Sequence, residues 1–96
     1  MRRHTIRLSV AAVSALECRG LEEAIDAHDQ AVKAAWKGSR LVFYGSERDA
    51  LFEALNEMSN AEDAFAEERN HDPELRRFAG RAARSLAAVA GRVLRA

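Results

Sequence analysis

The chain has 96 residues, with 15 acidic and 15 basic side chains and a formal net charge of zero. This length fits one small domain spanning residues 1–96, and the neutral total argues against a general nucleic-acid-binding protein. The single cysteine excludes an internal disulfide, and no apolar run reaches the roughly 18 residues of a membrane span, so we expect a cytoplasmic protein without membrane contact.

The first segment, 4–9 (HTIRLS), alternates apolar and polar side chains with the period of a β-strand. Ser9 is a suitable N-cap for the helix that follows. Helical composition continues over 10–37, but the phase of the apolar positions changes at Gly20. We therefore expect one long helix with a kink or short break near Gly20, ending with a lysine and a glycine.

A second strand is predicted at about 40–45 (RLVFYG), followed by two helices that form a C-terminal hairpin. Ser46 is the expected N-cap of the first of these helices, which runs to about Arg69. Asp72 should cap the last helix, with Pro73 in its first position. Because 20 residues of the chain are alanine, we expect a thin core in which the helices approach closely.

The predicted fold is α+β and predominantly helical. It has two short strands, about 4–9 and 40–45, a long kinked helix between them and a C-terminal helical hairpin. The strands should pair in parallel if the first helix is unbroken, and antiparallel if Gly20 divides it into two helices. Two strands alone make a weak sheet, so its free edge is a candidate contact for a homodimer.

The apolar stripes of the helices predict which large side chains are buried. Trp36, Phe65 and Phe78 each extend or border a stripe, so we expect all three in the core. Cys18 is interpreted as a small buried hydrophobic residue. Glu62 falls on the core side of its helix, where burial would require an arginine partner from the last helix.

The sequence contains no glycine-rich phosphate loop, zinc-ligand spacing or metalloprotease motif. The three histidines lie on separate segments, and a continuous helix would place Cys18 about 15 Å from His28. His28 sits in an apolar stripe, where a hydrogen-bonded core or boundary histidine is the simpler interpretation. We therefore expect no enzymatic activity, metal, cofactor or small-molecule substrate.

Segment 46–70 (SERDALFEALNEMSNAEDAFAEERN) concentrates the negative charge, with eight acids and only two bases. Its predicted core stripe leaves six polar residues on the opposite face of the helix: Asp49, Glu53, Asn56, Asn60, Asp63 and Glu67. No base interrupts this row, which would extend about 27 Å. We call these six residues the acidic ridge and predict that it contacts a partner protein with a basic surface.

The last helix has the opposite charge, with six arginines and one glutamate over 73–96. Five of the arginines cluster opposite its apolar stripe: Arg77, Arg81, Arg84, Arg92 and Arg95. Two interpretations stay open. Either the flanks of the two helices pair across the hairpin and the remaining charges are only solvated, or one charged row binds a partner.

The second strand supplies two further candidate contacts. If Leu41 and Phe43 face the helices, Val42 and Tyr44 lie on the outer face of the sheet. An aromatic side chain with a polar tip is common at protein interfaces, which makes both residues candidates for partner binding. A boundary position half-covered by a loop explains Tyr44 equally well.

The opening RRHTIRLS, followed by a helix, resembles the start of ribbon-helix-helix repressors. In that family the N-terminal strands pair in a dimer and enter the major groove of DNA. The resemblance covers only about the first third of the chain and implies that Thr5 and Arg7 face the bases. The arginines of the last helix, Arg77, Arg81 and Arg84, are a second candidate contact with DNA.

The first functional hypothesis is a non-enzymatic protein-binding module that docks the acidic ridge on a basic surface, such as that of a nucleic-acid-binding protein or complex. In size and character the chain is similar to small bacterial inhibitors encoded by phages and mobile elements, including anti-CRISPR proteins; a toxin–antitoxin or scaffold partner would share this pattern. The alternative is a small DNA-binding transcriptional regulator of ribbon-helix-helix character that uses the N-terminal strand. A near-neutral isoelectric point of 6.8 favours the first hypothesis.

Overall fold

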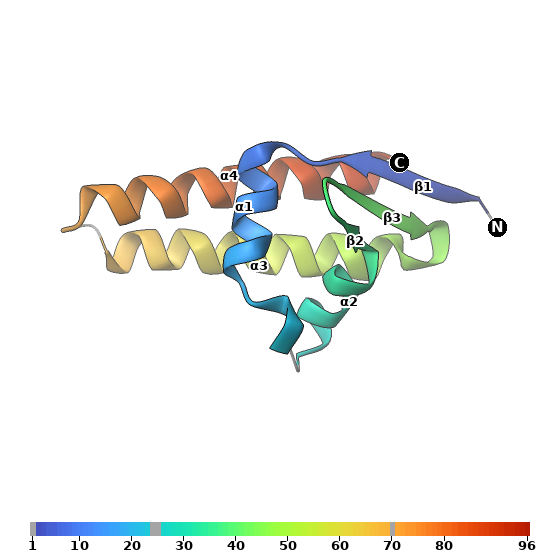
Figure 1. The fold of residues 1–96 in the computed structure, drawn as a ribbon, viewed down its shortest axis with the longest axis horizontal. Helices are drawn as coiled ribbons and strands as arrows, with labels where there is room; N and C mark the ends of the chain where they lie inside the picture. Colours follow the sequence, from blue (N-terminus) through green and yellow to red (C-terminus); the bar gives the residue numbers. More distant parts are fainter. Residues whose placement is uncertain (1, 24–25, 70) are drawn as a thin grey trace.

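The computed structural model describes residues 2–23, 26–69 and 71–96, which form two packed layers. One layer is a long helical hairpin, and the other holds a small sheet and two short helices (Figure 1). This architecture is α+β and predominantly helical, as predicted. The elements in chain order are β1 Arg3–Arg7, α1 Val10–Cys18, η1 Leu21–Glu23, α2 Ala27–Ala35, β2 Trp36–Lys37, β3 Arg40–Tyr44, η2 Gly45–Glu47, α3 Arg48–Glu68 and α4 Pro73–Arg95.

The sheet is antiparallel, with the strand order β1-β3-β2. Both predicted strands are present, and a third one, β2, is absent from the sequence prediction. Trp36 and Lys37 pair with β3 instead of continuing the helix. Gly38, with a φ of 66°, turns the chain from β2 into β3, and this left-handed conformation favours glycine. The glycine therefore serves a hairpin turn rather than the end of a helix.

The chain between β1 and β2 forms two helices rather than the predicted single kinked helix. α1 begins after Ser9, whose side-chain oxygen accepts a hydrogen bond from the amide of Ala12 at 3.2 Å. It ends before Gly20, which has a φ of 65°. A short 3-10 turn follows, and the chain then returns toward the sheet as α2 (Figure 1). β1 and β3 consequently pair antiparallel, the outcome expected for a broken helix.

The start of α3 also differs from the prediction. Ser46 does not cap this helix, because it lies within the 3-10 turn η2 and α3 begins at Arg48. The carboxylate of Glu47 instead accepts a hydrogen bond from the backbone amide of Tyr44 at 2.8 Å. This contact ties the turn to the end of β3 and so fixes where the hairpin joins the sheet.

The hairpin turns at the predicted cap. Asp72 accepts hydrogen bonds from the amides two and three residues further on, and Pro73 begins α4. Across the contact between the helices, the Ser59 hydroxyl donates to the carbonyl of Ala83 at 2.8 Å. Buried alanines occur on both helices: Ala54, Ala79, Ala82, Ala83 and Ala90. Side chains this small allow the close helix approach that the alanine-rich composition predicts.

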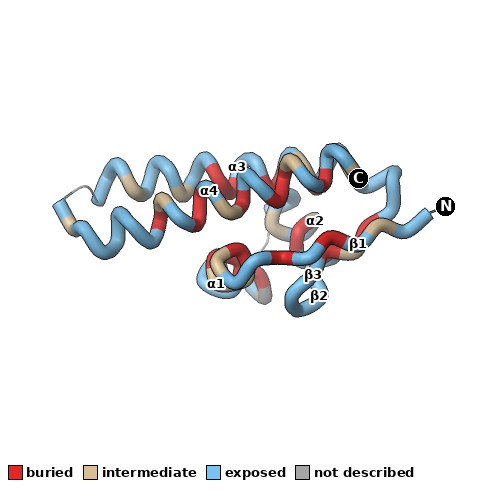
Figure 2. The backbone as a smooth tube through the Cα atoms, turned by 90° about the horizontal axis from the view of Figure 1, so that it is seen from above, coloured by how far each residue is buried: buried red, intermediate tan, exposed pale blue. Residues whose placement is uncertain are grey.

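The core occupies only part of the hairpin. On α3 the large buried side chains end at Met58, and on α4 they begin at Leu86. The sheet, α1 and α2 cover the half of the hairpin nearest the chain termini, and the tip projects beyond them (Figure 2). The molecule is accordingly elongated, measuring 48 × 25 × 20 Å. The largest fully buried side chains are Leu16, Val32, Leu41, Phe43, Leu51, Leu55, Met58, Leu86 and Val93.

This limited coverage shows that the predicted burial of Phe65 and Phe78 is wrong. Phe65 is 36% exposed and Phe78 44% exposed, and Leu75 in the same region is 41% exposed. Trp36, the third aromatic residue of that prediction, is half-buried and packs against the core. The apolar stripe of α4 thus continues past the point that the second layer reaches.

Replacing the fully buried Leu86 with alanine should lower the free energy of unfolding by about 2–5 kcal/mol, because the change leaves a cavity. Phe78→Ala removes a larger side chain that is partly exposed, and its effect should be smaller than that of Leu86→Ala. Urea denaturation of the two variants measures the difference. A larger loss for Phe78→Ala would mean that the hairpin tip is covered in solution, contrary to the structure.

Candidate functional site

The acidic ridge lies along the exposed side of α3. All six of its residues are exposed, whereas Leu51, Ala54, Leu55 and Met58 are buried on the opposite side of the helix. α3 packs against α4 and α2 through that buried side. The ridge therefore faces outward, and at its far end Asp63 and Glu67 share a surface hollow with Arg76 of α4. Helix geometry makes the ridge a straight row about 27 Å long.

Two further exposed carboxylates, Glu57 and Glu68, lie beside the ridge. With the four acids of the ridge they give α3 six exposed carboxylates, or roughly one per 5 Å of helix. One strand of a nucleic-acid duplex carries a phosphate per about 3.4 Å of rise, so α3 has about two-thirds of that linear charge density. The one base within α3, Arg48, is half-buried at the first residue of the helix, with its Nη2 atom 3.5 Å from Nε2 of His4.

Glu62 is the one acid of α3 that is not exposed. Burial raises the pKa of its carboxyl group, and the positive charge of Arg19 opposes that rise. Arg19 follows α1, so the expected arginine neighbour does not come from the last helix as predicted. Both residues line a surface hollow of about 340 Å³, together with Ala61, Phe65, Leu75 and Phe78.

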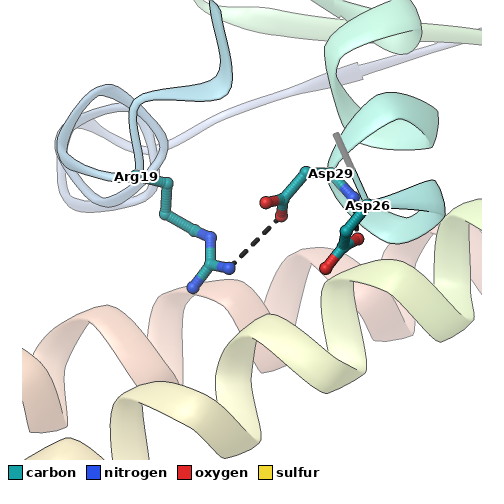
Figure 3. A network of polar contacts seen from close by, with 3 residues as sticks. All are labelled: Arg19, Asp26 and Asp29. Atoms are coloured by element: carbon teal, nitrogen blue, oxygen red, sulfur yellow. Dashed lines mark hydrogen bonds and ion pairs between the residues drawn. The ribbon is translucent and has the colours of Figure 1, made fainter. Parts of the chain in front are cut away.

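Arg19 is positioned by an ion pair that bridges the break between the first two helices. Its guanidinium lies 3.2 Å from the carboxylate of Asp29 in the first turn of α2 (Figure 3). The amide of Asp29 in turn donates to the side chain of Asp26, the N-cap of α2, at 3.0 Å. This hydrogen bond is the main cause that lowers the pKa of Asp26. The same contacts that start α2 therefore hold Arg19 close to Glu62.

Val42 and Tyr44 lie on the face of the sheet that is turned away from the hairpin. Val42 is half-buried and Tyr44 is 42% exposed. Thr5 pairs with Val42 and Arg7 with Arg40, so Thr5 and Arg7 share this open face. The acidic ridge belongs to the other layer and points in a different direction. The residues predicted to bind a partner therefore form two surfaces, not one.

Arg77, Arg81 and Arg84 are exposed on α4 toward the tip of the hairpin. They lie between about 12 and 22 Å along the helix from Arg92, whose guanidinium donates to the carbonyl of Arg7 in β1. The structure therefore separates the two sets of residues that were predicted to contact DNA. Among the residues that the structure describes, no ion pair joins α3 to α4, so the flanks of the hairpin do not pair as one interpretation held.

Cys18 and His28 are both exposed, in contrast to the buried position expected for Cys18 and the core or boundary position expected for His28. They belong to different helices, α1 and α2. Within the described ranges, no group of three or more His, Cys, Asp or Glu side chains is placed to hold a metal ion. In the same ranges, none of the helices combines the length and apolar character needed to span a membrane.

An apolar patch at the hairpin tip is the surface feature that sequence reasoning missed. It is formed by Phe65, Leu75 and Phe78 of the hairpin. Phe78 lines two hollows of about 340 and 350 Å³, and the second of these also contains Val10 at the start of α1. This patch could have been predicted from the lengths of the helices. α3 and α4 have 21 and 23 residues, whereas α1 and α2 have nine each and do not cover so long a hairpin.

Comparison of the chain with protein-family models, with curated proteins and with solved structures finds no match. Function is therefore inferred from the surfaces themselves.

The raised pKa of Glu62 predicts that neutralising this carboxyl group has a pH-dependent effect on stability. A carboxyl group whose pKa is higher in the folded than in the unfolded protein favours folding when protonated, and that contribution is lost as the pH rises through the folded pKa. Glu62→Gln should therefore raise Tm near neutral pH and have little effect below the ordinary pKa of 4.5. Glu57→Gln, on the exposed side of the same helix, is the matched control; it removes only a like-charge pair with Glu53 and should raise Tm less than Glu62→Gln does at neutral pH. Thermal unfolding, measured near neutral pH and below pH 4.5, tests this prediction. A Tm for Glu62→Gln below that of the wild-type protein at neutral pH would contradict it.

Proposed function

We propose that the protein is a non-enzymatic binding module that docks the acidic ridge on a basic surface of a partner protein. The observation that carries the proposal is the uninterrupted row of exposed carboxylates and amides on α3, in a chain of zero net charge. Like charges aligned on a helix face repel each other and destabilise the helix by about 0.2–0.5 kcal/mol per pair. A basic partner surface would offset this repulsion. Binding to such a surface therefore explains why the like charges are aligned on one face of the helix.

The ridge suits a partner that ordinarily binds nucleic acid. The carboxylates of α3 have about two-thirds of the linear charge density of one nucleic-acid strand, and the helix holds them in place before binding, which lowers the entropy lost on association. Asn56 and Asn60 occupy the centre of the ridge, where their amides both donate and accept hydrogen bonds. On this proposal the protein competes with nucleic acid for a basic groove. It would then act as a bacterial cytoplasmic inhibitor of anti-CRISPR character, from a phage or mobile element.

A DNA-binding regulator that uses the N-terminal strand is the second candidate. The exposure of Thr5 and Arg7 on the open face of the sheet favours it. β1 pairs with β3 of its own chain, so a homodimer through the strand edge would use the outer edge of β1. In this alternative Arg7→Ala abolishes DNA binding and the acidic ridge is dispensable.

Replacing Asp49, Glu53, Asp63 and Glu67 with lysine should preserve the fold, because all four side chains are exposed, and should weaken binding of the partner. Each exposed ion pair contributes only about 0–1 kcal/mol, and long-range attraction mainly raises the association rate. The loss should therefore be largest at low salt and appear mostly in the association rate. Circular dichroism first checks that the variant is folded. Surface plasmon resonance then measures binding over a salt series, using the purified partner that the wild-type protein captures from host lysate.

Two control variants separate the ridge from general charge effects. The same four residues changed to asparagine or glutamine lose their charge without reversing it, and should give an intermediate loss. Reversal of Glu17, Glu23 and Glu74, which are exposed acids outside α3, should leave binding unchanged. If the ridge variant kept full affinity at every salt concentration, the ridge would be an ordinary solvated helix face.

A further inference from the structure

The open face of the sheet is basic. Along β1 and β3, buried residues that face the hairpin, such as Ile6 and Phe43, alternate with residues that face away from it. The register places the outward residues of all three strands on one surface, which we call the basic face: Arg3, Thr5, Arg7, Lys37, Arg40, Val42 and Tyr44. Four of these seven residues are positively charged and exposed, and the three strands contain no aspartate or glutamate.

Three of the bases stand side by side. Arg40 of β3 lies opposite Arg7 of β1 and opposite Lys37 of β2. Neighbouring strands are about 4.8 Å apart, so these three positions form a row roughly 10 Å across. Like charges directly opposite each other destabilise a sheet. A bound polyanion would relieve this repulsion, and the neutral total charge of the chain conceals the arrangement.

Tyr44 lies at the other end of the same face, opposite Arg3 in the register. Its side chain is 42% exposed, and its backbone amide is held by the carboxylate of Glu47. An exposed aromatic ring on an open sheet face is a platform on which unpaired bases stack, whereas the bases of a duplex are already stacked on each other. The tyrosine therefore favours a single strand over a duplex as the anionic ligand.

We propose that the basic face binds single-stranded nucleic acid, with a base stacked on Tyr44 and phosphates contacted by Arg3, Arg7, Lys37 and Arg40. The five residues of β1 span about 17 Å, which is room for only a few nucleotides. The hairpin packs on the opposite face of the sheet and leaves this one uncovered (Figure 1). The acidic ridge lies in the other layer, so it does not repel a strand bound here. This site is separate from the proposed protein-docking surface, and neither proposal depends on the other.

Fluorescence anisotropy with short labelled oligouridylate and oligothymidylate tests the proposal. Neutralising four phosphates of a single strand should make the logarithm of the association constant fall with the logarithm of salt concentration at a slope of about −3. Arg7→Ala combined with Arg40→Ala should reduce this slope by about 1.4. Tyr44→Ala should weaken binding about tenfold without changing the slope, and Tyr44→Phe, which keeps the ring, should retain binding. Binding of either oligonucleotide with these variant effects supports the proposal, and the ratio of the two affinities identifies the ligand as RNA or DNA.

The matched control is Arg69→Ala combined with Arg76→Ala, which removes two exposed charges from the hairpin tip and leaves the sheet unchanged. This control should keep the wild-type affinity and slope. Equal losses in the two double variants would show non-specific charge attraction and overturn the proposal. Tighter binding of a duplex of the same length, or no binding at low salt, would also overturn it. If the sheet double variant fails to fold, Lys37→Ala repeats the test with one exposed change and should reduce the slope by about 0.7.

Discussion

Small side chains along the contact between α3 and α4 let two long helices pack closely enough to form a platform for the rest of the fold. The buried alanines keep the backbones near each other, and the hydrogen bond from Ser59 to the carbonyl of Ala83 links them without a bulky side chain. The platform presents Leu51 and Leu55 from α3, and Leu86 from α4, to the second layer. Larger residues at the alanine positions would separate the helices and pull these leucines out of register with the sheet.

Most of the fold can be predicted from the sequence because local residue patterns determine most of the helices and strands. Alternating apolar residues locate β1 and β3, and the caps Ser9 and Asp72 start helices where predicted. β2 is missed because two residues are too few to show an alternating pattern, and Trp36 and Lys37 suit a helix equally well. The cap at Ser46 is wrong because the backbone forms a 3-10 turn there, which the identity of one residue does not reveal.

A candidate surface can be predicted from the sequence when all its residues lie on one helix or strand. It cannot be predicted when it depends on how two elements pack or pair. Helix periodicity alone finds the acidic ridge, since exposure follows from position around α3. Periodicity does not tell how far a neighbouring layer extends, so Phe65 and Phe78 were expected in the core although nothing covers them fully. The row of Arg7, Arg40 and Lys37 depends on the sheet register, and Lys37 joins it only through β2, a strand that the sequence does not predict.

Net charge is a poor guide to the charged surfaces of this protein because acids and bases gather on different elements: α3 is acidic, whereas α4 and the open face of the sheet are basic. At physiological ionic strength the screening length is about 8 Å, well below the two shorter dimensions of the molecule, 25 and 20 Å. A ligand at the basic face therefore experiences the nearby bases and little of the field of α3, and a ligand at the ridge experiences the reverse. Zero net charge thus conceals an acidic and a basic surface that act separately. On the two proposals made above, the protein contacts a basic partner through α3 and an anionic strand through the sheet, which would bring it to complexes in which protein and nucleic acid already occur together.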